Sequence, residues 1–181
     1  MISMRSKITR VLLNYYFLNF QENLFVNEIS RKLDVDKRNL VKKLRELEYE
    51  GILKSQVRGN QKLYSINEKY PLYNEYKKIV FKTIGVENKL KGVFSNTNGI
   101  EKAFIYGSYA RDEIETHSDI DLLVIGNHKI LPLQRQINKL QKEIDREINI
   151  TNMDKREFLK RKKEENPFLK TILKKKHIKV I

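Results

Sequence analysis

The sequence predicts an α+β protein of two domains, and three observations support this prediction. Apolar residues recur at helical spacing over the first fifty positions, and two strand-like runs follow them. Further along, strand-like and helical runs alternate, which is typical of a small mixed sheet flanked by helices. Positive charge lies at the two ends: residues 1–70 have 14 Lys and Arg against 8 Asp and Glu, residues 154–181 have 11 against 4, and residues 71–153 have 12 against 11.

The composition limits the class of protein and its partners. The chain has 181 residues and no cysteine, so a disulfide scaffold and a thiolate metal site are excluded and a reducing, cytoplasmic location is expected. The apolar N-terminal run is interrupted by Arg10 and Asn14, so it predicts neither a signal peptide nor a membrane span. The formal net charge of +14 favours a polyanionic partner such as nucleic acid, although a well-solvated surface would also explain it.

The first domain is expected to be helical with one hairpin. Residues 5–18 repeat apolar positions at helical spacing. Asn27 is placed to cap a second helix, and Asp36 to cap a third that carries leucines on one face and ends at Gly51. The runs ILKSQV and QKLYSI on either side of RGN predict a β-hairpin with a Gly-Asn tip. This order of elements predicts a winged helix-turn-helix over residues 1–70.

Such a module places its third helix in the major groove of DNA. The hairpin resembles the wing of ArsR- and MarR-like transcription regulators, which implies double-stranded DNA as a partner, and a homodimer on paired half-sites is expected. The residues that we expect to contact DNA are Lys37, Arg38, Asn39, Lys42 and Lys43 on the helix and Arg58, Asn60 and Lys62 on the hairpin. The alternative is a winged helix that serves only protein contacts or dimerisation.

The rest of the chain predicts a second domain. Pro71 opens a helical segment, and two linking helices are expected over residues 71–95. The strands expected after them are KAFIYGS, SDIDLLVIG, EINIT and HIKVI, and the helices are YARDE, ILPLQRQINKLQKEIDRE, DKREFLKRKKEE and PFLKTILKK. These elements make up a domain over residues 96–181.

One stretch of this domain, GSYARDEIETHSDIDLLVIG, carries a pattern that points to chemistry. Asp119 and Asp121 are two residues apart on a strand, so both side chains point to the same face. Two neighbouring carboxylates repel each other, and a divalent cation such as Mg²⁺ or Mn²⁺ relieves that repulsion. A Gly-Ser turn before a short helix offers N–H groups to a phosphate, and Arg111 adds positive charge. Together these parts suit in-line attack on the phosphorus of a nucleotide.

The same stretch resembles the minimal nucleotidyltransferases of the DNA polymerase β superfamily, whose pattern is GSxARG, a short spacer and SDIDLLV. The resemblance extends over about residues 71–181 and departs from the pattern at Asp112, where many members have glycine. It implies that Asp119 and Asp121 bind metal ions. The residues expected at the nucleotide are Gly107, Ser108, Arg111 and Ser118. His117, within the motif, is expected to be a surface residue.

The resemblance also implies a third carboxylate on a later strand, which activates the attacking hydroxyl. Asn149 occupies the expected position in EINIT, and an amide cannot accept a proton. Glu147 lies two residues earlier on the same strand face and is the candidate to replace that carboxylate as a catalytic residue. Whether the domain is an active enzyme therefore stays open.

Three functions follow from these predictions. The first is a DNA-binding nucleotidyltransferase and transcription regulator, which moves a nucleoside monophosphate from an NTP, ATP being expected, to an acceptor hydroxyl. The resemblance implies a partner toxin as one such acceptor, with this chain acting like an antitoxin. The second is a non-catalytic regulator whose second domain senses a nucleotide or mediates dimerisation. The third is an RNA-modifying transferase that uses both basic ends to bind RNA.

Overall fold

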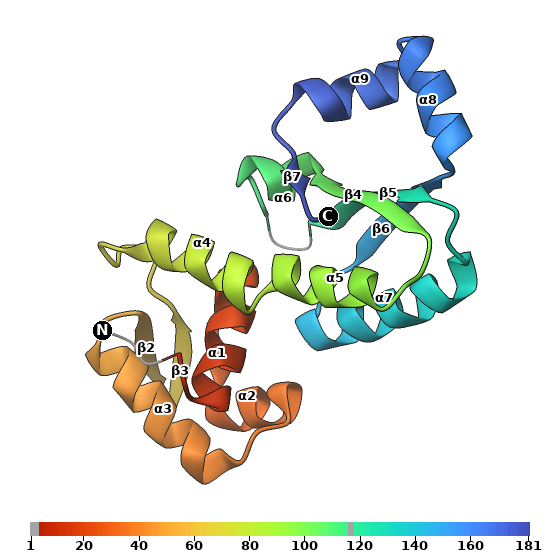
Figure 1. Cartoon of the computed structure of the whole chain (residues 1–181). Helices are drawn as coiled ribbons and strands as arrows, with labels where there is room; N and C mark the ends of the chain where they lie inside the picture. Colours follow the sequence, from red (N-terminus) through yellow and green to blue (C-terminus); the bar gives the residue numbers. More distant parts are fainter. Residues whose placement is uncertain (1–3, 116–117) are drawn as a thin grey trace. The chain divides into compact units, whose positions relative to one another are not determined.

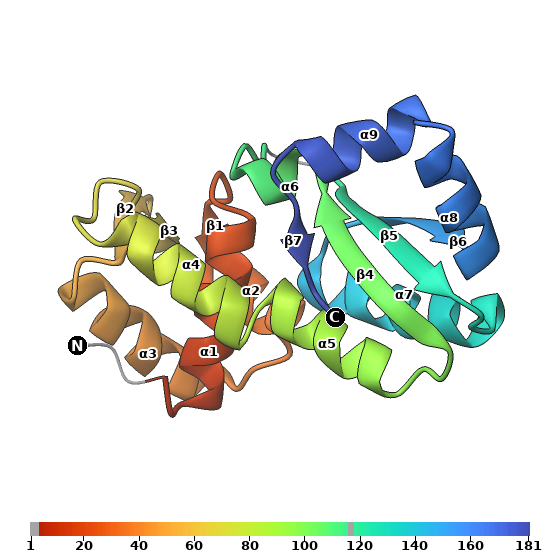
Figure 2. The ribbon, with the colours of Figure 1, turned by 45° about the horizontal axis from the view of Figure 1, so that its top comes forward.

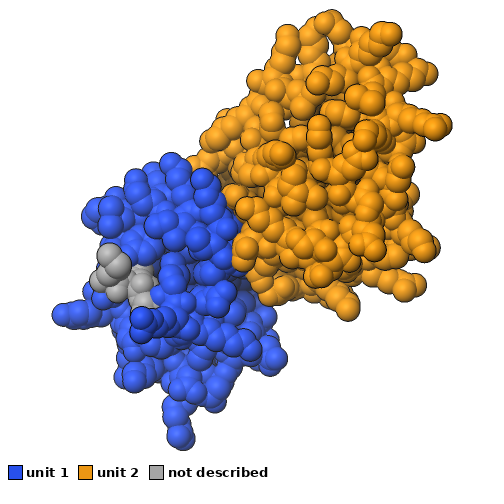
Figure 3. All heavy atoms as spheres, viewed as in Figure 1, with its two compact units in different colours: residues 1–85 blue, residues 86–181 orange. Residues whose placement is uncertain are grey.

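The computed structural model describes residues 4–115 and 118–181 and shows a mixture of helices and small sheets (Figure 1). This agrees with the predicted α+β class. The chain divides into two compact units, Met1–Gly85 and Val86–Ile181 (Figure 3). No helix in the described residues combines the length and the apolar character needed to cross a membrane.

The first unit contains four helices and a three-stranded antiparallel sheet within its described residues. Its elements are α1 (Lys7–Leu18), β1 (Leu24–Phe25), α2 (Val26–Leu33), α3 (Lys37–Tyr49), β2 (Leu53–Arg58), β3 (Gln61–Ile66) and α4 (Tyr73–Thr83). Helices α1, α2 and α3 bury leucine, isoleucine and aromatic side chains against one another and against the sheet. The predicted order of helices and hairpin is therefore present, with the short strand β1 added.

Local hydrogen bonds account for the starts of α2 and α3. The carboxylate of Asp36 accepts a hydrogen bond from the backbone N–H of Asn39 at 3.0 Å, which confirms the predicted cap of α3. The predicted cap of α2 is wrong, because that helix begins one residue before Asn27. Instead, the carboxylate of Glu28, in the first turn of the helix, accepts a hydrogen bond from the backbone N–H of Phe25 at 2.7 Å. This bond satisfies the N–H of the residue that precedes the helix.

The hairpin of β2 and β3 turns at Gly59 and Asn60, as predicted. The pair Arg58 and Gln61 closes the ladder, so the loop has two residues. Gly59 has a φ of 62°, whereas Asn60 is not among the described residues with positive φ, and this is the pattern of a type II′ turn. The turn therefore requires a glycine at its first position, and the flanking strands keep their twist.

The segment 71–95, expected as linking helices, is divided between the units. Helix α4 belongs to the first unit, where it packs against α1 and the Tyr73 ring lies 5.4 Å from the Phe17 ring. Helix α5 (Val86–Ser95) belongs to the second unit. Gly85 marks the division.

The second unit is built on a four-stranded mixed sheet in the order β6-β5-β4-β7. The strands are β4 (Ile100–Tyr106), β5 (Ile120–Gly126), β6 (Ile148–Met153) and β7 (Ile178–Lys179), and the helices besides α5 are α6 (Gly107–Arg111), α7 (Ile130–Ile144), α8 (Lys155–Lys163) and α9 (Pro167–Lys174). Strand β5 runs parallel to β6 and antiparallel to β4. The mixed character of the sheet was predicted.

Helices cover both faces of this sheet. Helices α5 and α7 lie on one side and α8 and α9 on the other (Figure 1, Figure 2). Strand β5 is buried on both sides, so Leu122 and Val124 face one layer while Leu123 and Ile125 face the other. On the α8–α9 side the core consists of Phe104, Leu123, Ile125, Met153, Phe158, Leu169 and Ile172. The candidate site continues this face toward the start of β5.

Candidate functional site

A row of polar side chains crosses three strands beyond the α8–α9 core. Tyr106 of β4 lies opposite Asp121 of β5, and Asp121 lies beside Asn149 of β6. These three residues occupy one face because each is paired in register with the next. Asp119, two residues before Asp121, shares the same face. The structure thus brings together the two predicted metal ligands at the edge of a buried core.

Gly107 forms the wall of this site against Asp121. It begins α6 with a φ of 74°, in the left-handed region that favours glycine. A Cβ at this position would overlap the Oδ2 atom of Asp121. The absence of a side chain therefore lets the Gly-Ser turn approach the carboxylate, and a phosphate held by that turn would lie close to Asp121.

The electrostatics of the pair follow from burial and mutual repulsion. Partial burial raises the pKa of Asp121, the charge of Asp119 raises it further, and the charge of Arg111 opposes the shift. Arg111 also forms an ion pair with Glu113, in which Nε and Oε2 are 2.6 Å apart. Arg111 therefore lies within electrostatic range of Asp121.

Asn149 takes the place next to the acids. Its Nδ2 atom donates a hydrogen bond to Oδ2 of Asp119 at 2.9 Å. The backbone carbonyl of Glu147 accepts a hydrogen bond from the N–H of Ile120 at 2.9 Å. Among residues 4–115 and 118–181, no three His, Cys, Asp or Glu side chains are grouped as a metal site, so Glu147 does not complete a three-carboxylate centre with Asp119 and Asp121.

The donor set fits a divalent cation that is shared with a polyphosphate. Asp119 and Asp121 supply carboxylate oxygens, and Asn149 can supply a neutral amide oxygen. Mg²⁺ is commonly held by one or two carboxylates, with substrate phosphates and water completing its coordination. A cation would also relieve the repulsion that raises the pKa of Asp121.

Ser118 has a local role in the structure. Its hydroxyl accepts from the N–H of Glu115 at 2.9 Å, shortly before β5 begins. The buried guanidinium of Arg146 donates to the carbonyls of Glu115 and Ser118, both at 2.9 Å. Arg146, to which no pattern in the sequence pointed, thus holds the backbone at Ser118, directly before Asp119. His117 lies outside the described residues.

Asp112 explains the departure from the pattern GSxARG. It ends α6 with a φ of 66°, in the left-handed region. Glycine adopts this conformation without steric cost, and aspartate is one of the few other residues that tolerate it. The substitution therefore keeps the turn, at a modest expense in backbone strain.

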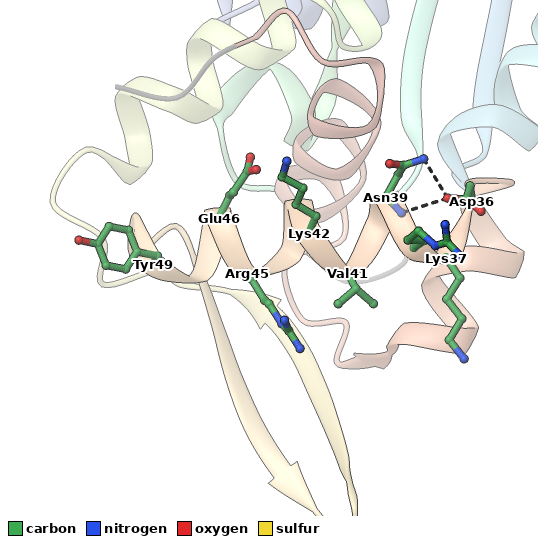
Figure 4. A pocket seen from close by; sticks show the side chains of 9 residues that line it. Asp36, Lys37, Asn39, Val41, Lys42, Arg45, Glu46 and Tyr49 are labelled. Carbon is green, nitrogen blue, oxygen red and sulfur yellow. Dashed lines mark hydrogen bonds between the residues drawn. The ribbon is translucent and has the colours of Figure 1, made fainter.

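In the first unit, the exposed side of α3 lines a groove of about 1270 Å³ (Figure 4). The residues of this groove are Asp36, Lys37, Arg38, Asn39, Val41, Lys42, Arg45, Glu46 and Tyr49. Arg38, Lys42, Arg45 and Tyr49 recur at helical spacing on the side opposite the buried leucines, and Tyr49 is 93% exposed. Arg45 and Tyr49 were not among the residues expected to contact DNA, although this periodicity places them on the same side of α3 as Arg38 and Lys42.

Three of the side chains expected to contact DNA form hydrogen bonds or ion pairs within the first unit. The Asn39 amide donates to Asp36 at 2.9 Å, as Figure 4 shows. Lys43 forms an ion pair with Glu46 at 2.6 Å. Lys62 pairs with Glu48 at 3.2 Å, and Glu48 also accepts from the Ser55 hydroxyl. Of the other expected residues, Lys37, Arg38, Lys42, Arg58 and Asn60 are exposed.

The polymerase beta nucleotidyltransferase family matches residues 88–179. A comparison with curated proteins finds no match. Similar solved structures include a toxin–antitoxin with AMP-PNP (16% identity over 52% of this chain and 72% of that chain, TM-score 0.39). Others are a mutant of the toxin–antitoxin MntA-HpeT (14%, 53% and 73%, TM-score 0.40) and a candidate nucleotidyltransferase of Sulfolobus solfataricus (20%, 41% and 68%, TM-score 0.29). These TM-scores mark distant likenesses, from which no function is inferred.

The raised pKa of Asp121 predicts that the site lowers stability in the absence of a cation. The pKa is higher in the folded chain than in the unfolded one, so stability falls as pH rises from the ordinary aspartate range through the raised value. Asp121→Asn should therefore raise the melting temperature in EDTA at pH 7 by about 1–3 °C, since solvent screens a partly exposed group, with no gain at pH 3. A lower melting temperature at pH 7 would contradict this account.

Proposed function

Because the chain belongs to the polymerase beta nucleotidyltransferase family, we propose that its second unit binds a nucleoside triphosphate, ATP being expected, with Mg²⁺ or Mn²⁺. The observation that carries this proposal is the placement of Asp119 and Asp121 beside the bare backbone of Gly107. The carboxylates would hold the cation, which neutralises phosphate charge when bound. The N–H groups of the turn at Gly107 and Ser108, with the guanidinium of Arg111, would meet phosphate oxygens.

We propose further that the bound triphosphate donates a nucleoside monophosphate. An acceptor hydroxyl attacks the α-phosphorus, the bond to the bridging oxygen breaks, and pyrophosphate leaves. The chain's residues orient the phosphates and hold the α-phosphorus in line, while the proton of the acceptor must pass to a base. Asn149 cannot accept that proton, because an amide is not a base. A hydroxyl of a partner toxin is the acceptor that the sequence resemblance implies.

A second function is favoured by the hydrogen bond between Asn149 and Asp119. An amide at this position occupies one oxygen of Asp119 and supplies no base. A unit with this arrangement would still bind nucleotide and cation. It would then act as a nucleotide sensor or a dimerisation unit within a regulator, without transfer.

We propose that the first unit is a winged helix that binds double-stranded DNA through α3 and the hairpin. The support is the outward stripe of Arg38, Lys42 and Arg45, which leaves cationic side chains clear of the leucine face. Guanidinium groups suit both phosphates and guanine edges. A transcription regulator that binds paired half-sites as a homodimer is the corresponding function.

Nucleotide binding is tested by titrating the full chain with ATP and Mg²⁺ in a calorimeter. The native protein should release heat at one site, and the double variant Asp119→Ala, Asp121→Ala should release none, because the cation loses both carboxylates. Glu143→Ala on α7 removes one exposed carboxylate away from the site and should bind as the native chain does. Equal heats for the native chain and the double variant would contradict the proposal.

Transfer is tested with α-labelled forms of the four NTPs and the chain's own hydroxyls or a supplied partner as acceptor. Asn149→Asp should raise the rate roughly 100-fold, because it restores a proton acceptor beside Asp119. Asn149→Ala serves as the control that removes the amide without adding a base. If Asn149→Asp transfers label no faster than the native chain, the amide at position 149 does not limit the rate of transfer. If neither protein transfers label, the sensor function is favoured.

DNA binding is tested by fluorescence anisotropy with a labelled duplex over a range of salt concentrations. Arg45→Ala should weaken binding and reduce the slope of log affinity against log salt by about 1 if the side chain meets a phosphate. Lys43→Ala removes the same charge from the same helix but from a side chain already paired with Glu46, so its effect should be smaller. Equal losses of DNA affinity in the two variants would contradict the proposed role of Arg38, Lys42 and Arg45. Equal affinity of the native chain for the duplex and for tRNA would favour an RNA substrate.

A further inference from the structure

An exposed aromatic ring lies at the edge of the carboxylate site. Phe168, near the start of α9, is 36% exposed. Its ring meets the Tyr106 ring at 5.8 Å between centroids, with the two planes at 88°. Tyr106 is the register partner of Asp121, so the ring against which Phe168 packs lies next to one of the acids.

Residues other than Phe168 hold the start of α9. The Asn166 side chain accepts from the N–H groups of Phe168 and Leu169, at 3.1 and 3.3 Å, and Pro167 occupies the first turn. Leu169 and Ile172 are buried in the core and anchor α9 to the sheet. The Phe168 ring is therefore presented by a helix that other residues hold in place.

The sheet face beside Tyr106 carries polar side chains. Asp121 and Asn149 lie on the same sheet face, and Thr151 follows with its hydroxyl 3.5 Å from that of Tyr106. In the described part of the second unit, Phe168 is the one aromatic among the large apolar side chains exposed to solvent. The Phe168 ring thus offers an apolar surface, which neither the proposed phosphate-binding turn nor the two acids can provide.

We propose that Phe168, supported by Tyr106, is the surface on which the nucleobase stacks, an inference that rests on the proposed nucleotide site. Every base has a π-face, so an aromatic platform binds all four bases without hydrogen-bond recognition. The site should therefore discriminate weakly among NTPs and prefer purines, whose larger rings stack over a greater area.

The test compares two ligands that differ in having a base. Full-length native chain, Phe168→Leu and Phe168→Tyr are each titrated with ATP and with inorganic tripolyphosphate in the presence of Mg²⁺. Phe168→Leu should weaken ATP binding roughly tenfold and leave tripolyphosphate binding unchanged, because only the stacking contact is lost. Phe168→Tyr should bind both ligands as the native chain does. Leu131→Ala, at an exposed apolar position on α7, should change neither.

Each other outcome has a distinct meaning. Unchanged ATP affinity in Phe168→Leu would overturn the stacking role while leaving the nucleotide site intact. An equal loss for ATP and tripolyphosphate, with a lowered melting temperature, would assign the ring to packing and overturn it as well. If the native chain binds neither ligand, the proposed nucleotide site itself fails, and the stacking role fails with it.

Discussion

The close approach of two carboxylates at the start of β5 is the constraint on which the candidate site depends. Asp119 and Asp121 share one face of a strand, and Gly107 lies against the second of them. The pKa of Asp121 is raised by partial burial and by its neighbour. Such an arrangement opposes folding and is compensated when a dication and a polyphosphate lie between the acids and the turn. The charge on Asp121 that would bind a cation therefore also lowers the stability of the fold when no cation is bound.

The fold places this pair where the chemistry needs it. The α8–α9 core buries the rest of the same sheet face, so the polar row begins where the apolar cover ends. Arg146, two residues beyond the end of α7, binds the carbonyls of Glu115 and Ser118 before β5, and α6 brings the Gly-Ser turn to the same edge. A rigid sheet thus carries the acids, while short connections carry the groups proposed to meet phosphate.

Features with local causes could be predicted from the sequence. Asp36 caps α3 through a neighbour three residues away, and Gly59 meets a steric requirement of its own turn. The spacing of Asp119 and Asp121 determines their common face, because side chains alternate along any strand. In these cases the residue and the partner that constrains it lie within a few positions of each other.

Other features depend on competition or on tertiary contacts. Glu28 caps α2 from inside the helix, so the side chain of Asn27 was not needed. The Asn39 amide donates to Asp36 within the groove of α3, and its residue type alone does not decide whether such an amide pairs inside the unit. The pairing of Phe168 with Tyr106 joins positions far apart in the chain, so it becomes visible only once α9 is packed on the sheet.

The central claim is tested most directly by a crystal structure of the full chain with Mg²⁺ and a non-hydrolysable ATP analogue. The account predicts electron density for an ion between Asp119 and Asp121, and a triphosphate whose oxygens meet the backbone at Gly107. Density for the nucleotide elsewhere, or both acids turned toward solvent with no ion between them, would contradict it.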